Sequence, residues 1–288
     1  MDYSAMIQNR KSVRAFLDTK VPDAVLNEIN QYFSKDCKKL IPSIRTEIRI
    51  FGSELGEKLE NEAGYRDFMI GAPSFLLVLS DKAEYFLENV AYITEDLILK
   101  MVELGLDSCW ITFNDGEKMK AALGLQSDKE VAAIIAFGYG KKTSKRIRLN
   151  ITNNSIVDAE VLRGYYSPRA GIDELVFSEK WGDTSDVYSQ IGDMDGILWR
   201  AFYAASLAPS YLNRQPYGFV LDGDTVVLVS KQDEYTGESS QKLNLGIVML
   251  HFAAVVSHMA GAVTWTMGTY DKDLGLPSGC SAVAYCKL

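Results

Sequence analysis

The chain has 288 residues, which is enough for one large domain or two smaller ones. Its composition, 47% hydrophobic and 24% charged, is typical of a soluble globular protein and excludes a disordered chain. A formal net charge of −8 argues against general attraction to nucleic acid or to anionic lipid, because both partners need a basic surface.

The distribution of apolar residues along the chain indicates neither a membrane protein nor an exported protein. The first residues, Met1 to Lys11, lack the apolar core of a signal peptide. The nearest approach to a membrane span, Leu243 to Ala262, contains Asn244, Ser257 and two histidines, and it predicts a buried helix instead. We therefore expect a cytoplasmic protein whose four cysteines, which show no CxxC spacing, stay reduced.

The first notable segment is the run Arg10-Lys11-Ser12-Val13-Arg14. If it is extended, Arg10, Ser12 and Arg14 share one face, because side chains alternate along a strand. Two guanidinium groups and a hydroxyl on one face suit a phosphate dianion. A helix would turn Ser12 away from the arginines, and a solvated basic patch is the competing interpretation.

The rest of the first half predicts a strand, a helix and a second strand. Phe75 to Leu79 is a short apolar strand, and a helical pattern from Asn89 ends at Gly105 before a segment that carries Trp110. Val131 to Phe137 is the next strand. The basic, Asn-rich stretch from Lys141 to Asn154 predicts a linker or crossover, which divides the chain into domains 1–150 and 151–288.

The second half has its own notable segment, a loop between two prolines. Pro209 ends the helical pattern Ile197 to Leu207, and Pro216 admits an edge strand, Tyr217 to Leu221. Between them lie three polar side chains, Ser210, Asn213 and Gln215. Amides both donate and accept hydrogen bonds, which suits a ligand with a polar ring edge; an ordinary polar connection is the alternative.

The two halves resemble each other in three elements that occur in the same order. Thr225 to Tyr235 resembles Phe75 to Tyr85, Asn244 to Trp265 resembles Asn89 to Trp110, and a closing strand, Ser281 to Tyr285, matches Val131 to Phe137. Such a repeat predicts either a pseudo-dimer or two independent domains. The pseudo-dimer is favoured because each half carries one of the two notable segments.

Together these segments resemble the FMN-dependent nitroreductase family. Arg10 to Arg14 matches its Arg-x-Ser-x-Arg element, and Ala208 to Tyr217 matches its Ala-Pro-Ser-x-x-Asn-x-Gln-Pro-aromatic element. Leu104 to Ile111 resembles the family segment that passes the flavin N5, and Ala132 to Gly140 with Arg148 resembles its closing strand and last phosphate-binding arginine. The resemblance implies an α+β, nitroreductase-like fold of the fused "TM nitroreductase" type. Two diverged copies of an antiparallel-sheet-plus-helices unit would form a pseudo-dimer.

The arrangement of the motifs departs from ordinary family members. There both motifs lie in one subunit, and a homodimer builds two flavin sites. Here they lie in opposite halves: Leu40 to Glu47 keeps a Pro-Ser but loses the amides, and Arg163 to Arg169 loses the Arg-Ser-Arg spacing. This departure implies one FMN site at the pseudo-dimer interface of a monomer.

The resemblance also implies roles for individual residues. Arg10, Arg14 and Arg148 with Ser12 would bind the phosphate, and Lys11 would approach the N1/O2 edge of the flavin. Asn213 and Gln215 would hydrogen-bond the pyrimidine edge or the ribityl chain. The remaining contacts would be Pro209, Ser210 and Tyr211 along the ring, and the segment Trp110, Ile111 and Thr112, whose backbone amides would reach N5 or O4.

The implied activity is hydride transfer from NAD(P)H, through FMN, to a nitroaromatic, quinone or similar small acceptor, with no side chain as general acid or base. The alternative is a flavin-binding protein without turnover, acting as a carrier, sensor or structural subunit. A flavin-destroying or dehalogenating enzyme would need a substrate lid that the sequence does not reveal. We expect Trp265 in the core, and His251 and His258 as core or interface residues rather than metal ligands.

Overall fold

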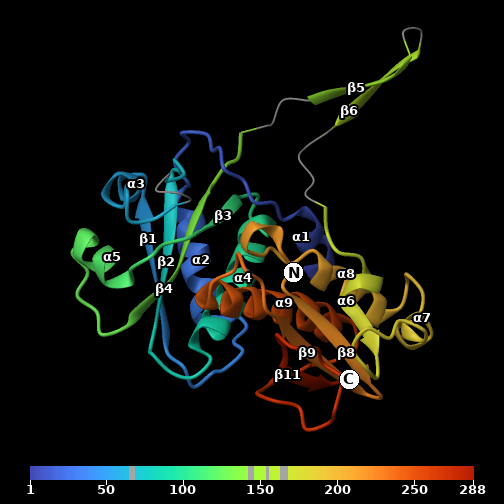
Figure 1. Cartoon of the computed structure of the whole chain (residues 1–288). Helices are drawn as coiled ribbons and strands as arrows, with labels where there is room; N and C mark the ends of the chain where they lie inside the picture. Colours follow the sequence, from blue (N-terminus) through green and yellow to red (C-terminus); the bar gives the residue numbers. More distant parts are fainter. Residues whose placement is uncertain (65–68, 142–145, 154–155, 163–167) are drawn as a thin grey trace.

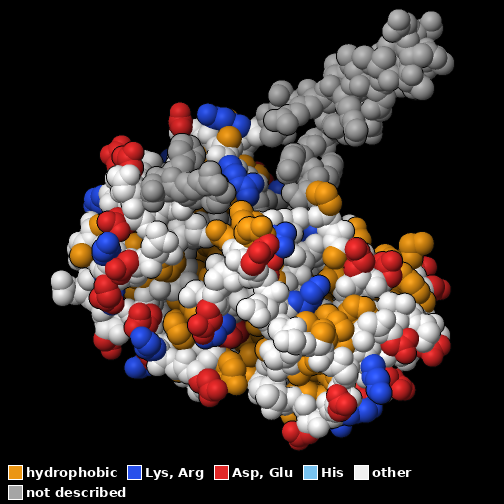
Figure 2. Space-filling model, in the orientation of Figure 1, with side chains coloured by type: hydrophobic (Ala, Val, Ile, Leu, Met, Phe, Trp, Pro, Cys, Tyr) orange, Lys and Arg blue, Asp and Glu red, His pale blue; other side chains and the backbone are white. Residues whose placement is uncertain are grey.

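The computed structural model describes residues 1–64, 69–141, 146–153, 156–162 and 168–288, and for 146–153 and 156–162 it describes the backbone alone. Two mainly antiparallel sheets flank a layer of helices, with the first-half sheet on one side and the second-half sheet on the other (Figure 1). On the face shown in Figure 2, acidic and basic side chains are interspersed.

The first sheet has four strands in the order β1-β2-β4-β3. β1 spans Thr46–Gly52, β2 spans Ser74–Ser80, β3 spans Asp107–Ile111 and β4 spans Glu130–Gly138. All three pairings are antiparallel, and every residue of β2 is buried. The predicted strands at Phe75 and Val131 are confirmed, with one more residue at each end.

The second sheet repeats this order and adds one strand. Its order is β10-β11-β9-β8-β7, so β8-β9-β11-β10 corresponds to β1-β2-β4-β3. The strands are β7 Val176–Ser178, β8 Tyr217–Asp222, β9 Thr225–Lys231, β10 Thr266–Met267 and β11 Cys280–Lys287. The topology therefore confirms the internal duplication.

One strand prediction is wrong in its place in the sheet. β8 follows Pro216 as expected, but it is not an edge strand, because β7 pairs with it in parallel. Pro216 lies just before β8, so its missing N–H removes no hydrogen bond from within the strand.

Helices α4 and α9 form the centre of the molecule, packed against each other between the sheets (Figure 1). α4 spans Phe86–Glu103 and α9 spans Glu238–Met259. α9 is long and apolar enough to cross a membrane, but 72% of its apolar window is buried inside the protein. An apolar surface all round is typical of a helix that packs on every side, and α9 is the core helix that the sequence predicted.

The two central helices meet at equivalent points of the repeat. Gly246 of α9 lies against Glu88 and Ala91 of α4. Ala91 and Gly246 follow Asn89 and Asn244 by the same number of residues, so each half contributes the same position to the contact. Equivalent residues meet in this way on the axis of a symmetric dimer, and the contact supports the pseudo-dimer.

The remaining helices surround this pair. They are α1 Tyr3–Asn9, α2 Asp23–Lys35, α3 Glu54–Lys58, α5 Gly116–Leu123, α6 Ile172–Leu175, α7 Val187–Ile191, α8 Ile197–Ser206 and the short 3-10 turn η1 Tyr211–Asn213. α8 confirms the helix predicted before Pro209.

The connection between the halves is more structured than the sequence suggested. Part of the predicted linker, Lys141 to Asn154, forms β5 Arg146–Asn153, which pairs with β6 Ile156–Leu162 in a separate two-stranded sheet. The halves are therefore joined through a β-hairpin rather than a plain linker.

Candidate functional site

The N-terminal cation motif leaves α1 in an extended conformation. Asp2 caps α1 by accepting a hydrogen bond from the Ala5 amide at 3.1 Å, and the helix ends at Asn9. Arg10 then has φ −60° and ψ 129°. The next residues run beside β3, where Ser12 bridges Ser108 in parallel. The backbone is therefore extended at Arg10 and makes a strand-like bridge at Ser12, so the segment is not helical.

The three cations of this motif differ in exposure. The Arg10 side chain is 5% exposed, whereas Lys11 and Arg14 are exposed to solvent. Arg14 makes one long hydrogen bond, from Nη1 to the Ser12 carbonyl at 3.4 Å. The guanidinium of Arg14 and the ammonium of Lys11 are therefore accessible to a ligand, while Arg10 lies beneath them.

Arg10 lies beside a carboxylate that has no access to solvent. Its Nε is 3.6 Å from Oε1 of Glu95 on α4, too far for a hydrogen bond, and among the described residues this buried Nε has no hydrogen-bond partner. Glu95 also accepts a hydrogen bond from Trp110 Nε1 at 2.9 Å and shares one with His251 Nε2 at 3.0 Å. This buried cluster joins the first motif, β3 and α9.

Electrostatics lower the pKa of Glu95 despite its burial. Removal from water alone would raise the pKa of its carboxyl group. The hydrogen bond from His251, the charge of Arg10 and the bond from Trp110 outweigh that effect and lower the pKa below its ordinary value.

The loop after α8 holds unusual backbone conformations. Leu212, Asn213 and Gln215 have φ of 49°, 58° and 48°, the left-handed region that residues other than glycine rarely adopt. Ser210 Oγ accepts a hydrogen bond from the Gln215 amide at 2.9 Å, and the buried Asn244 accepts one from the Tyr211 amide at 3.0 Å. Strain of this kind persists only where neighbouring contacts impose it, and it is common in ligand-binding loops.

The two amides of this loop hold the segment that precedes α6. Asn213 Nδ2 donates to the Pro168 carbonyl at 2.6 Å, and Gln215 Oε1 accepts from the Ala170 amide at 2.8 Å. Gln215 Nε2 donates to the Ser206 carbonyl at 2.9 Å, and its side chain is buried. Both ends of the Gln215 amide are thus engaged within the protein.

Arg169, in that segment, contacts the start of the loop. Its Nη1 donates to the Ala208 carbonyl at 2.5 Å. Burial, and then the positive charge of Arg10, lower the pKa of Arg169. The loop side of the candidate site therefore carries a half-buried cation.

The third predicted segment lies next to the first. Ser12 and Val13 run along β3, with the Val13 amide donating to the Ser108 carbonyl at 2.9 Å, so Trp110 and Ile111 are close to the cation motif. Ile111 is buried, whereas Thr112 is exposed and donates from Oγ1 to the Gly64 carbonyl at 3.1 Å. The side chain of Arg148 lies outside the described residues.

Sequence reasoning missed Glu95 and Arg169. A signal existed for Glu95, because the acidic pair Glu95-Asp96 interrupts an apolar helix, and buried carboxylates need partners. Nothing in the sequence indicated Arg169, since it follows a segment without the Arg-Ser-Arg spacing.

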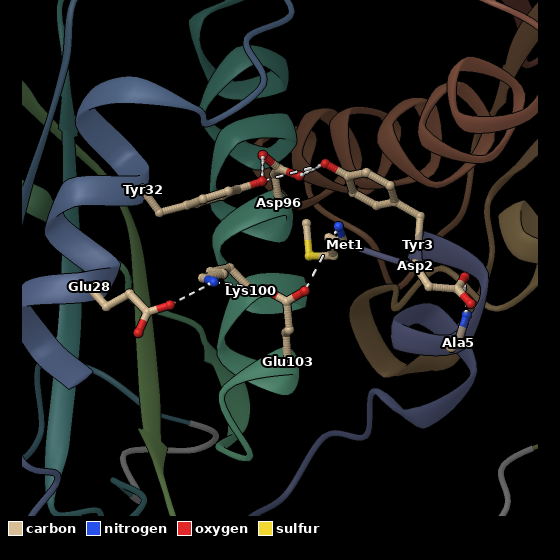
Figure 3. A network of polar contacts seen from close by, with 9 residues as sticks. All are labelled: Met1, Asp2, Tyr3, Ala5, Glu28, Tyr32, Asp96, Lys100 and Glu103. Atoms are coloured by element: carbon tan, nitrogen blue, oxygen red, sulfur yellow. Dashed lines mark hydrogen bonds and ion pairs between the residues drawn. The ribbon is translucent and has the colours of Figure 1, made fainter.

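Asp96 organises a separate network on another side of α4 (Figure 3). It accepts hydrogen bonds from Tyr3 at 2.9 Å, Tyr32 at 3.0 Å and the Lys38 amide at 2.8 Å. Burial raises the pKa of this carboxyl group, and these hydrogen bonds only partly offset the rise. Asp96 corresponds in the repeat to His251, so the two halves differ here in charge and in partners.

The other aromatic and histidine residues lie largely where expected. Trp265 is buried and donates from Nε1 to the Met249 carbonyl at 3.1 Å. His251 is fully buried at the interface of the halves, but His258 is exposed, because α9 reaches solvent at its end. Within the described ranges, no three potential metal ligands cluster.

A cavity of about 330 Å³ lies between α1 and α8. Its walls include Gln8, Trp199, Tyr203 and Leu207, with Trp199 and Tyr203 stacked at 5.2 Å between ring centroids. The lining contains none of the described residues predicted to contact flavin, so this cavity is distinct from the candidate site.

Comparison with known proteins gives one family match and several structural matches. The family model described as "Putative TM nitroreductase" matches residues 3–256. A putative nitroreductase from Thermotoga maritima MSB8 is 18% identical, with a TM-score of 0.58 over 100% of this chain and 93% of that one. At this identity the likeness shows the fold alone, and it confirms the predicted α+β, nitroreductase-like fold class.

Other solved structures match about half of the chain. A nitroreductase family protein from Clostridium novyi NT is 19% identical over 49% of this chain and 86% of its own, with a TM-score of 0.44. A nitroreductase with bound FMN from Bacteroides fragilis NCTC 9343 is 18% identical over 56% of this chain and 100% of its own, with a TM-score of 0.42. No curated protein sequence matches the chain.

Proposed function

We propose a function for this chain, which belongs to the Putative TM nitroreductase family: it is an FMN-dependent oxidoreductase with one flavin site shared by its two halves. It would transfer hydride from NAD(P)H to a nitroaromatic, quinone or similar small acceptor. The observation that carries the proposal is the buried cluster in which Glu95 lies 3.6 Å from Arg10 of the Arg-Ser-Arg segment and contacts His251 of the second half at 3.0 Å.

The described cations fit the phosphate of FMN. Arg10 is buried with an unpartnered Nε, and a buried donor without a partner favours an anionic ligand that completes its hydrogen bonds. Arg14 is exposed beside it, and Ser12 adds a hydroxyl on the same extended strand. These residues would hold the phosphate, with Arg148 as a fourth contact predicted from the resemblance.

The loop from Pro209 to Gln215 would shape the other end of the site. Gln215 fixes the segment before α6, so we assign it to the wall of the site rather than to a direct contact through its amide. Asn213 Oδ1, Ser210 and Tyr211 would contact the ribityl chain or the ring. The left-handed residues of this loop keep its backbone in a form ready for a ligand.

The β3 segment would border the redox-active face. Trp110 is fixed by its hydrogen bond to Glu95, and the backbone amides of Ile111 and Thr112 would donate to the ring. Bound FMN supplies the hydride chemistry itself. Lys11, exposed at the edge of the motif, would place a positive charge near the pyrimidine edge. We assign no general acid or base, and the cytoplasmic location expected from the sequence stays a prediction.

Anaerobic reduction tests the proposed activity. The purified protein is expected to be yellow, to bleach with NADH or NADPH, and to regain its colour with a nitroaromatic or a quinone. Bleaching by neither nucleotide would refute the reductase and leave a flavin-binding protein without turnover. A colourless protein that takes up no added FMN would refute both.

A further inference from the structure

The buried pair Glu95 and His251 is not explained by packing alone. Both side chains are 0% exposed, one on α4 of the first half and the other on α9 of the second. His251 contacts Glu95 Oε1 through Nε2 at 3.0 Å and the Ala204 carbonyl through Nδ1 at 2.9 Å. The pair therefore joins the two central helices and α8.

Both ring nitrogens of His251 face oxygen acceptors. The Ala204 carbonyl can only accept, so Nδ1 must carry a hydrogen. The contact between Nε2 and Glu95 then needs one more hydrogen, which lies either on the imidazole or on the carboxyl group. In either form, one proton is shared between Nε2 and the carboxyl group, and the total charge of the pair is zero.

We infer that this shared proton is the reason why the buried Arg10 can bind an anion, and that His251 is a positioning residue for the flavin phosphate. The inference rests on the proposed function. Without the proton, ionised Glu95, 3.6 Å from Arg10, would cancel the positive charge of that arginine. With it, Glu95 still orients Arg10 and Trp110, and the charge of the Arg10 guanidinium remains available to a phosphate dianion.

The charged groups around His251 come from three elements. Glu95 lies on α4, Arg10 follows α1, and Arg169 precedes α6. The exposed His258 lies on the same helix as His251 and is the second of only two histidines in the chain, so it provides a matched control.

Flavin affinity tests the charge argument. Dissociation constants for FMN and for riboflavin, which lacks the phosphate, would be measured on flavin-free protein by fluorescence titration. His251→Gln keeps a donor toward Glu95 but removes the proton, so it should weaken FMN by about tenfold or more and leave riboflavin unchanged. The double variant Glu95→Gln/His251→Gln removes the negative charge as well and should recover FMN affinity. His258→Gln should match the wild type.

The outcomes separate the inference from the proposed function. Equal weakening of FMN and riboflavin by His251→Gln, or no weakening, would overturn the inference. A double variant that binds FMN no better than His251→Gln would also overturn it. A wild-type chain that binds neither flavin would instead refute the proposed function.

Discussion

Replacement of Gly246 by alanine tests the contact on which the pseudo-dimer depends. A Cβ at this position would lie 2.7 Å from Ala91 Cβ and closer still to the Glu88 carbonyl oxygen. Carbon atoms in contact prefer about 3.5 to 4.0 Å, so α4 and α9 must separate by roughly 1 Å. The Glu88 oxygen belongs to the backbone and has no rotamer that could relieve the contact.

The expected loss of stability is the difference of two effects. Overpacking a core contact costs about 1–3 kcal/mol, whereas alanine in place of glycine inside a helix gains about 1 kcal/mol. Because one clash is with backbone, we expect the higher part of the range, and Gly246→Ala should lower the free energy of unfolding by about 1–2 kcal/mol.

Urea unfolding followed by circular dichroism and by tryptophan fluorescence would measure this change. The variant Ala91→Gly/Gly246→Ala moves the methyl group across the contact and should recover only part of the loss, since the clash with Glu88 remains. A Gly246→Ala protein that is about 1 kcal/mol more stable than the wild type would show helix propensity alone and would refute the close contact.

Three further predictions concern the cation motif, the buried glutamate and the cysteines. Arg14→Ala should remove FMN from the whole chain, while Arg45→Ala, an exposed arginine paired with Asp81, should retain it; released flavin measured by absorbance decides. The pKa of Glu95 is lowered in the folded protein from its ordinary value of 4.5. The stabilisation that ionised Glu95 provides is therefore complete above pH 4.5 and is lost as the pH falls further. Glu95→Gln should therefore flatten the fall of unfolding free energy with pH below 4.5, and an unchanged slope would contradict this. All four cysteines are free, and burial raises the pKa of Cys286 to about 12 and also raises that of Cys37 and Cys109. At pH 8 these three should react with a thiol reagent only after denaturation, and rapid reaction in the native state would show that they are accessible.

The repeat was predictable because its strongest elements have local signals. The strands at Phe75 and Thr225 are continuous apolar runs, and the helices at Asn89 and Asn244 keep a helical pattern up to a glycine. In both halves these strands and helices lie in the hydrophobic core, as expected. The position of β8 inside the sheet was not predictable in this way. Its neighbour β7 has only three residues, and α8 separates the two strands in the sequence.

The candidate site was predictable only where a motif carried it. The Arg10 segment and the loop after Pro209 have local patterns, and the structure forms an extended backbone at Arg10 and a loop after Pro209. Glu95 and His251 meet through a contact between residues far apart in the chain, and so do Arg169 and Ala208, so no spacing could reveal these pairs. The same reason explains Gln215, whose amide is engaged by backbone groups that only the folded chain brings close.

The number of FMN molecules per chain tests the central claim most directly. Flavin released from purified protein, quantified against protein concentration and combined with the mass in solution, gives this number. We expect one FMN for each monomeric chain, because the two halves together supply one set of motifs. Two FMN per chain, or one shared between two chains, would contradict it.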